Sequence, residues 1–176
     1  MSGHNKWSKI KNKKAVEDAK RSKLFSMLVR TITMESRAAQ GDKNHPHVRA
    51  AIEKARAANM PTENIERAVA KGVGVGGDAY TEVLYETYGP GGSAVIIEAI
   101  TDNKNRTAAE IRHLLLEMGT ELASPGSALW AFKKKAEGWE AQMTVPLNDG
   151  DGEKLAVLVE KLEEHPDVSN VYSNAV

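Results

Sequence analysis

Apolar residues in the first part of the chain recur at intervals of three and four, the spacing of one face of an α-helix. The stretch "RSKLFSMLVRTITMESRAAQG" predicts a helix that ends at Gly41, a typical C-terminal stop. Pro46 opens a second predicted helix, "PHVRAAIEKARAANM", and Pro61 opens a third, "PTENIERAVAKG", with Gly72 beyond its end. Because all three are short, they must pack on one another to bury their apolar faces.

The period changes in the second part of the chain. The stretch "TEVLYETYGPGGSAVIIEAITDN" predicts two strands around a turn, and "RTAAEIRHLLLEMG" predicts a helix that stops at Gly119. Further strands are predicted in "SALWAF", "WEAQMTV" and "VSNVYS", and a second helix in "DGEKLAVLVEKLEEH". After the extra leading strand, this order is that of a ferredoxin-like sandwich. The predicted fold class is α+β: an N-terminal three-helix domain followed by a ferredoxin-like α/β sandwich domain.

Charge divides the chain at the same place. The net charge is zero, yet residues 1–77 carry 16 Lys and Arg against 7 Asp and Glu, whereas residues 78–176 carry 8 against 17. The glycine-rich residues 72–77 predict a helix stop that runs into a flexible linker. We therefore expect a basic helical domain over residues 1–77 and an acidic α/β domain over residues 78–176, with the basic half binding a polyanion.

Eight of the basic residues lie within the first 23 positions, and Trp7 stands among them with Ile10 as its only apolar neighbour. Lysines can neutralise phosphates while an exposed indole stacks on an unpaired base, a combination expected of an RNA-binding segment. The alternative is that Trp7 packs back onto the three helices. We expect a flexible basic arm over residues 1–23. Its expected nucleic-acid-binding residues are His4, Lys6, Trp7, Lys9, Lys11, Lys13, Lys14, Lys20, Arg21 and Lys23.

The stretch "TDNKNRTAAEIR" in the acidic half contains two further candidate nucleic-acid-binding residues. Asn105 or Thr107 can cap the helix that follows, which is a purely structural explanation. Lys104 and Arg106, however, place two positive charges at the helix start, where the helix dipole disfavours them. An RNA phosphate would relieve that cost, so both residues join the expected nucleic-acid-binding set.

Catalytic and metal-binding patterns are incomplete. The chain has no cysteine, and the pair His45 and His47 lacks the companions that would complete a zinc site. Glu98 and Asp102 could act together as acid and base, but carboxylates at strand ends are usually solvated or capping. We expect no enzymatic activity, no metal and no cofactor. Because no apolar stretch reaches the roughly 18 residues of a membrane span, we also expect a cytoplasmic protein without a membrane partner.

Several collinear stretches resemble the signatures of the YebC/PmpR family. They include "MSGHNKWSKIKNKKAVEDAKRSKLFSMLVR", "VRAAIEKARAANMP", "YETYGPGGSAVIIEAITDNKNRT" and "GSALWAF", and the final segment resembles the family's C-terminal end. The resemblance implies an N-terminal helical domain plus α/β domains, and no catalysis. It also implies either DNA-binding transcriptional regulation or translational activation on ribosomes stalled at proline-rich nascent chains.

The resemblance also marks a difference in domain content. Family members are typically longer, with a further α/β domain between the strands that correspond to "ALWAFKKK" and "EAQMTVPL"; here only residues 136–139 separate them. One inserted domain is therefore expected to be missing. The leading hypothesis is a ribosome-associated translational activator that binds ribosomal RNA. A transcriptional regulator that binds duplex DNA is the alternative, and a hydrolase or nuclease that uses Glu98 and Asp102 is a third possibility.

Overall fold

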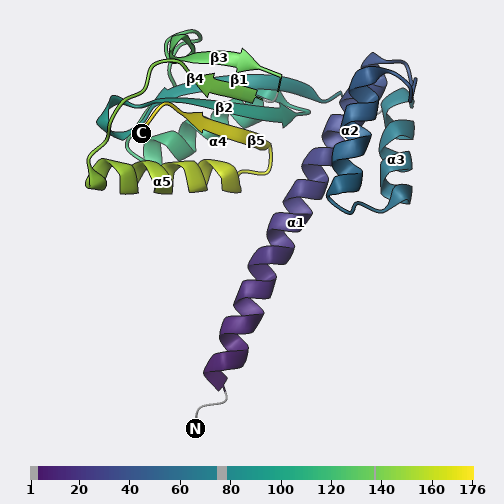
Figure 1. Ribbon diagram of the computed structural model, residues 1–176, viewed down its shortest axis with the longest axis horizontal. Coiled ribbons are helices and arrows are strands. Elements are labelled where there is room, and N and C mark those ends of the chain that lie inside the picture. The colour runs from purple at the N-terminus through teal and green to yellow at the C-terminus, as the bar shows by residue number, and fades with distance from the viewer. Residues whose placement is uncertain (1–3, 75–78, 137) are drawn as a thin grey trace. The chain divides into compact units, whose positions relative to one another are not determined.

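The computed structural model describes residues 4–74, 79–136 and 138–176, with side chains from Val16 onward. The chain forms two compact units, Met1–Ala79 and Tyr80–Val176 (Figure 1). The first unit, the helical unit, contains α1 (His4–Ala38), α2 (Pro46–Ala57) and α3 (Thr62–Val73). Its core is formed by apolar residues of the three helices and of the turn between α2 and α3, namely Ile32, Ala51, Ala55, Met60, Ile65, Ala68 and Val69. The three predicted helices are present, and α2 begins at Pro46 as the sequence indicated.

The first helix begins at His4 and not near Arg21, where the apolar pattern starts. Residues 4–20 contain six lysines, a residue type of high intrinsic helix propensity, but they show no continuous apolar pattern. Periodicity therefore could not detect this part of the helix. From residue 4 onward, the residues of the expected arm belong to α1.

The predicted linker begins later than the glycine pattern indicated. Gly72 lies inside α3 and is buried, and the helix ends at Val73 with Gly74 in extended backbone. Residues 75–77 of the predicted linker lie outside the described residues. Gly72 is therefore a packing residue of the helical unit, and it lies directly against α1.

The second unit, the α/β unit, has three layers. Its central antiparallel sheet has the strand order β1-β2-β5, and a separate hairpin pairs β3 with β4. The strands are β1 (Thr81–Tyr88), β2 (Ala94–Thr101), β3 (Phe132–Lys135), β4 (Gly138–Ala141) and β5 (Val168–Ser173), and the helices are α4 (Lys104–Glu117) and α5 (Asp149–Glu164). Both helices cover one face of the sheet and the hairpin covers the other (Figure 1).

The central strand explains why this sheet is covered on both faces. Along β2, Val95 and Ile97 pack with α4 and α5, whereas Ala94 and Ile96 pack under the β3–β4 hairpin. An almost continuous apolar run is expected of a strand that is buried on both faces. The sequence of β2 therefore indicates that it is the central strand of the sheet.

The α+β class and the order of elements agree with the sequence prediction. The strand pairing departs from a single ferredoxin-like sheet, because β1 occupies one edge beside β2 while β3 and β4 pair only with each other. The stretch "SALWAF" is mostly a loop and a short 3-10 turn, Leu129–Ala131, and strand structure begins only at Phe132. Periodicity identifies strands but does not determine their partners.

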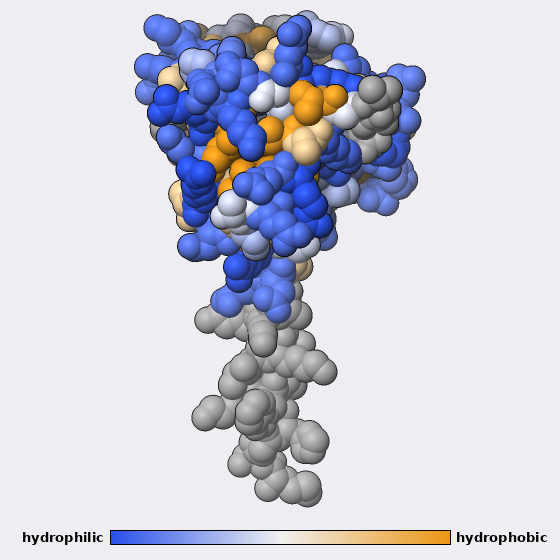
Figure 2. All heavy atoms as spheres, turned by 90° about the vertical axis from the view of Figure 1, so that its right-hand side faces the viewer, coloured by the Kyte–Doolittle hydropathy of each residue, from blue (hydrophilic) through white to orange (hydrophobic). Residues whose placement is uncertain are grey.

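Seen from the side of α2 and α3, the surface is hydrophilic over most of its area, with a strip of apolar residues among the polar ones (Figure 2). No helix within the described ranges is long and apolar enough to cross a membrane.

Candidate nucleic-acid interface

The basic residues at the start of the chain lie on the first turns of α1. Lys6, Lys9 and Lys13 belong to these turns. No acidic residue occupies the first turn, so the positive end of the helix dipole meets further positive charge. This arrangement is unfavourable in isolation. The remaining predicted residues of this segment, His4, Trp7, Lys11 and Lys14, belong to the same part of α1.

Further along α1, the predicted residues differ in their surroundings. Lys20 and Arg21 are exposed, and Lys23 is partly buried. The Arg21 guanidinium carbon lies 5.2 Å from the centroid of the Phe25 ring, so one face of the guanidinium is already covered by an aromatic ring. Lys20 thus offers an exposed charge, while Arg21 offers a charge in a fixed position.

A second set of basic residues on α2 was missed by the sequence analysis. Arg49 and Arg56 are exposed and lie seven residues apart, so they share one face of α2, about 10 Å from each other along the axis. Within the described residues, neither guanidinium has a carboxylate within 4.0 Å. The signal was the spacing of seven between two arginines, which an analysis of apolar positions does not register. These two residues enlarge the basic surface of the helical unit beyond α1.

The third helix has a different charge. Glu63 and Glu66 are exposed on its first turns, and Arg67 lies 3.8 Å from Glu63 and donates to Asn64 Oδ1 at 2.5 Å. The single arginine is therefore neutralised locally. The exposed first turns of α3 do not suit contact with a phosphate backbone.

In the α/β unit, Arg106 is held within its own domain. Its guanidinium donates to the Asp167 carboxylate at 2.6 Å and lies 3.1 Å from Asp102 and 3.8 Å from Glu110. The hydrogen bond with Asp167, followed by the charge of Asp167, raises the pKa of Arg106. Three carboxylates of the same unit thus balance the positive charge of Arg106 without an external phosphate.

Arg106 balances the charge of Asp167, which is buried. The Asp167 side chain is buried and also accepts a hydrogen bond from the Thr107 hydroxyl at 2.7 Å. The cap of α4 is Asn103, whose side chain accepts from the Arg106 amide at 3.1 Å, and not Asn105 or Thr107 as predicted. Lys104, the first residue of α4, is exposed and stays in the predicted set.

The candidate acid–base pair is also used structurally. Glu98 accepts hydrogen bonds from Trp139 Nε1 at 2.8 Å, Asn170 Nδ2 at 3.0 Å and the Tyr172 hydroxyl at 3.4 Å. Burial, and then the charge of Glu98, raise the pKa of Tyr172. Asp102 is ion-paired with Arg106. Both carboxylates thus have partners that account for them without catalysis.

One cluster in the described part of the chain has the composition of a metal site. Ligand atoms of Glu110, His165 and Asp167 lie within 4.8 Å of one another. His165 accepts from the Asp167 amide through Nδ1 and lies 3.0 Å from Glu110 through Nε2, so the ring is held at both nitrogens. Because the Arg106 guanidinium already contacts Asp167 and Glu110, a cation is built into this cluster.

Two family models match most of the chain. The model described as "TACO1/YebC protein N-terminal domain" matches residues 5–75, and the model described as "TACO1/YebC second and third domain" matches residues 80–138. The second match ends at Gly138, the first residue of β4, next to the place where the inserted domain of longer family members is expected. These matches agree with the resemblance that the sequence motifs indicated.

Relatives named "Probable transcriptional regulatory protein" are also similar to this chain in sequence. One from Petrotoga mobilis is 51% identical over 137 residues, which is 77% of this chain and 55% of the relative. The chain thus spans about half the length of the curated relatives of this kind. One from Pelotomaculum thermopropionicum is 38% identical over 238 positions that cover 99% of this chain and 98% of the relative. Since this chain has 176 residues, the relative contains segments without a counterpart here.

A solved structure is similar as well. The crystal structure of a conserved hypothetical protein from Aquifex aeolicus superposes with a TM-score of 0.83, is 30% identical, and covers 90% of this chain and 91% of its own. The match covers most of the helical and α/β units taken together.

Proposed function

This chain belongs to the TACO1/YebC family, and from that premise we propose that it is a non-enzymatic factor that binds RNA through its helical unit. We further propose that it acts on ribosomes as a translational activator that relieves stalling, with ribosomal RNA as its partner. Such a role places it in the cytoplasm. The relatives' printed names support regulation in general.

The observation that carries the proposal is the uncompensated positive charge of the helical unit. Exposed basic residues lie along α1 and on α2, where Arg49 and Arg56 have no carboxylate within 4.0 Å among the described residues. Unpaired charges of this kind attract phosphates and release bound counterions. The α/β unit has the opposite charge and keeps its arginine at position 106 paired internally.

A DNA-binding transcriptional regulator is the alternative function, since the relatives carry that name. In a helix-turn-helix protein, the second helix of the pair lies in the major groove with its N-terminal residues near the bases. Here α2 and α3 are joined by a short turn, but the first turns of α3 expose Glu63 and Glu66. Two carboxylates at that place would face a phosphate-lined groove, which favours RNA over duplex DNA as the partner.

The test is sedimentation of the tagged protein with ribosomes across a salt gradient, with duplex DNA as competitor. We expect the protein to sediment with ribosomes at low salt and to dissociate as salt rises, while duplex DNA in excess displaces little of it. A matched pair of variants controls for charge, because each removes one arginine: Arg49→Ala should weaken the association, and Arg67→Ala should not. Efficient displacement by duplex DNA would instead support the transcriptional alternative.

A further inference from the structure

Two exposed aromatic side chains of the α/β unit are fixed by one backbone carbonyl. Trp130 is 55% exposed and Tyr88 is 39% exposed. The Trp130 indole N–H donates to the Ser127 carbonyl at 2.7 Å, and the Tyr88 hydroxyl donates to the same carbonyl. The indole N–H also lies 3.3 Å from the Tyr88 hydroxyl. Both polar groups are therefore satisfied internally, and what these side chains offer to a partner is the surface of their rings.

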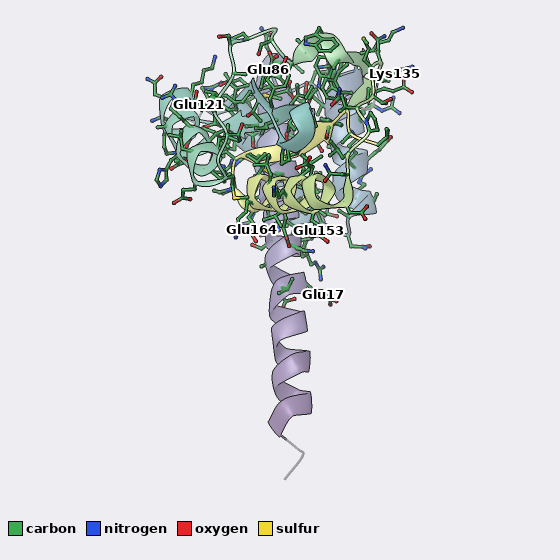
Figure 3. All side chains as sticks on the ribbon, turned by 90° about the vertical axis from the view of Figure 1, so that its left-hand side faces the viewer. Glu17, Glu86, Glu121, Lys135, Glu153 and Glu164 are labelled. Carbon is green, nitrogen blue, oxygen red and sulfur yellow. The ribbon has the colours of Figure 1, made fainter. Side chains whose placement is uncertain are left out.

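The loop that carries Trp130 is held by a buried carboxylate. Glu86 of β1 is 4% exposed and accepts hydrogen bonds from the amides of Gly126, Ala128 and Leu129 at 2.6 to 2.8 Å. Figure 3 labels Glu86 within the α/β unit, on the side of the sheet away from the labelled Glu153 and Glu164 of α5. A buried carboxylate is costly unless it is fully hydrogen-bonded, and here its bonds go to the loop immediately before Trp130.

These contacts produce an unusual combination. A large aromatic residue commonly lowers its free energy by burial, yet here a buried hydrogen-bond network fixes the loop and leaves the indole exposed. Rings with preset orientations lose little conformational freedom when a partner stacks on them. An exposed ring in a fixed orientation is suited to stacking on a flat group of a partner, whatever the partner's sequence.

Charge near Trp130 is consistent with a nucleic acid. Lys133, Lys134 and Lys135 follow on β3 and are exposed, against Glu140 on the paired strand. Lys135 forms an ion pair with Glu140 at 2.8 Å, and Lys134 lies over the Trp139 ring. The hydrogen bond from Lys135, and then its charge, lower the pKa of Glu140. The hairpin sequence, residues 132–141, thus carries three lysines against two glutamates, so it has a small positive net charge within an acidic unit.

We propose that Trp130 is a stacking platform for an unpaired base of RNA, with Tyr88 fixing its orientation and the β3 lysines near the adjoining phosphate. Stacking on an aromatic ring tolerates any base, because every base has a π-face. This inference rests on the proposed RNA-binding function. It adds a contact in the α/β unit that is independent of the basic residues of α1 and α2.

The experiment measures the affinity of the full chain for a labelled 20-nucleotide oligouridine by fluorescence anisotropy. Trp130→Ala should weaken binding about 5- to 150-fold with an unchanged salt dependence. Trp130→Phe, which keeps a ring, should lose much less. Leu116→Ala is the matched control, since Leu116 is 54% exposed in the same unit and should bind as the wild type does. A melting curve for each variant checks that the fold is intact.

Tryptophan emission provides a second measurement that does not depend on the alanine variant. Oligouridine should quench an emission component of the wild type that is missing in Trp130→Phe. If the wild type binds RNA but Trp130→Ala binds equally well and no such component is quenched, the inference is wrong and the proposed function stands. If an octa-arginine peptide quenches Trp130 and RNA does not, the partner is a basic peptide and the inference is overturned. If the wild type binds no RNA, the proposed function itself fails.

Discussion

Gly72 of α3 lies so close to Ser36 of α1 that a Cβ added to Gly72 would come 2.7 Å from the Ser36 Cβ and 2.6 Å from the Thr33 carbonyl oxygen. The Ser36 hydroxyl donates to the Val69 carbonyl at 2.8 Å, and the Thr33 hydroxyl donates to the Ala68 carbonyl at 3.2 Å. Two helices therefore touch through their backbones at this point. Gly72, which the sequence pattern assigns to a linker, is therefore the residue that allows α1 and α3 to pack this closely.

This contact gives the first prediction. In most helices, replacing glycine by alanine stabilises the protein by up to about 1 kcal/mol. Gly72→Ala should instead lower the free energy of unfolding by about 1 to 3 kcal/mol, because α1 and α3 must separate to admit the methyl group. Gly74→Ala is the control, since a Cβ there meets only ordinary contacts at 3.6 Å and beyond. Urea unfolding of both variants decides the matter, and equal stability of the two would contradict the close approach.

The elements that the sequence predicted well are those with local signals. Pro46 at the start of α2 and Gly119 after α4 act through backbone angles that the residue itself determines, and the apolar run of β2 follows from its two buried faces. The start of α1 was not predicted, because its lysines favour a helix without producing an apolar pattern.

The candidate site could be predicted from the sequence only in part, for a similar reason. The basic start of α1 shows in the sequence as charge density, whereas the internal pairing of Arg106 depends on Asp167, 61 positions away. Glu86 gives no periodic signal, and its role appears only when strand β1 is placed under the loop that it binds. Long-range partners, and hence which charges stay free, require the folded chain.

The second prediction separates the two residues at the start of α4. Arg106→Gln removes the ion pair with buried Asp167, so the melting temperature should fall while the salt dependence of RNA binding stays as in the wild type. Lys104→Gln should change the melting temperature little, because Lys104 is exposed. Thermal melts and RNA titrations at several salt concentrations test both. A flatter salt dependence for Arg106→Gln with an unchanged melt would return Arg106 to the interface.

The third prediction concerns alkaline pH. Since burial and the charge of Glu98 raise the pKa of Tyr172 above its ordinary value of 10.0, the folded state keeps the phenol protonated longer than the unfolded state does. This contribution to stability is fully present below about pH 10 and is lost as pH rises through the folded pKa. The free energy of unfolding should therefore fall more steeply above pH 10 in the wild type than in Tyr172→Phe. Parallel curves in urea titrations at pH 8 to 11 would refute the assignment.

The last prediction separates the charge of the first turns of α1 from its tryptophan. If Lys6 and Lys9 contact phosphates of unpaired RNA, each alanine replacement should flatten the slope of log affinity against log salt by roughly 0.7. Trp7→Ala should weaken binding by about 1 to 3 kcal/mol at low and high salt alike, because stacking on a base releases no counterions. Affinities over a salt series, with a melting curve for each variant, distinguish the two effects. A Trp7→Ala protein that melts several degrees lower yet binds RNA normally would show that the indole packs on the helical unit.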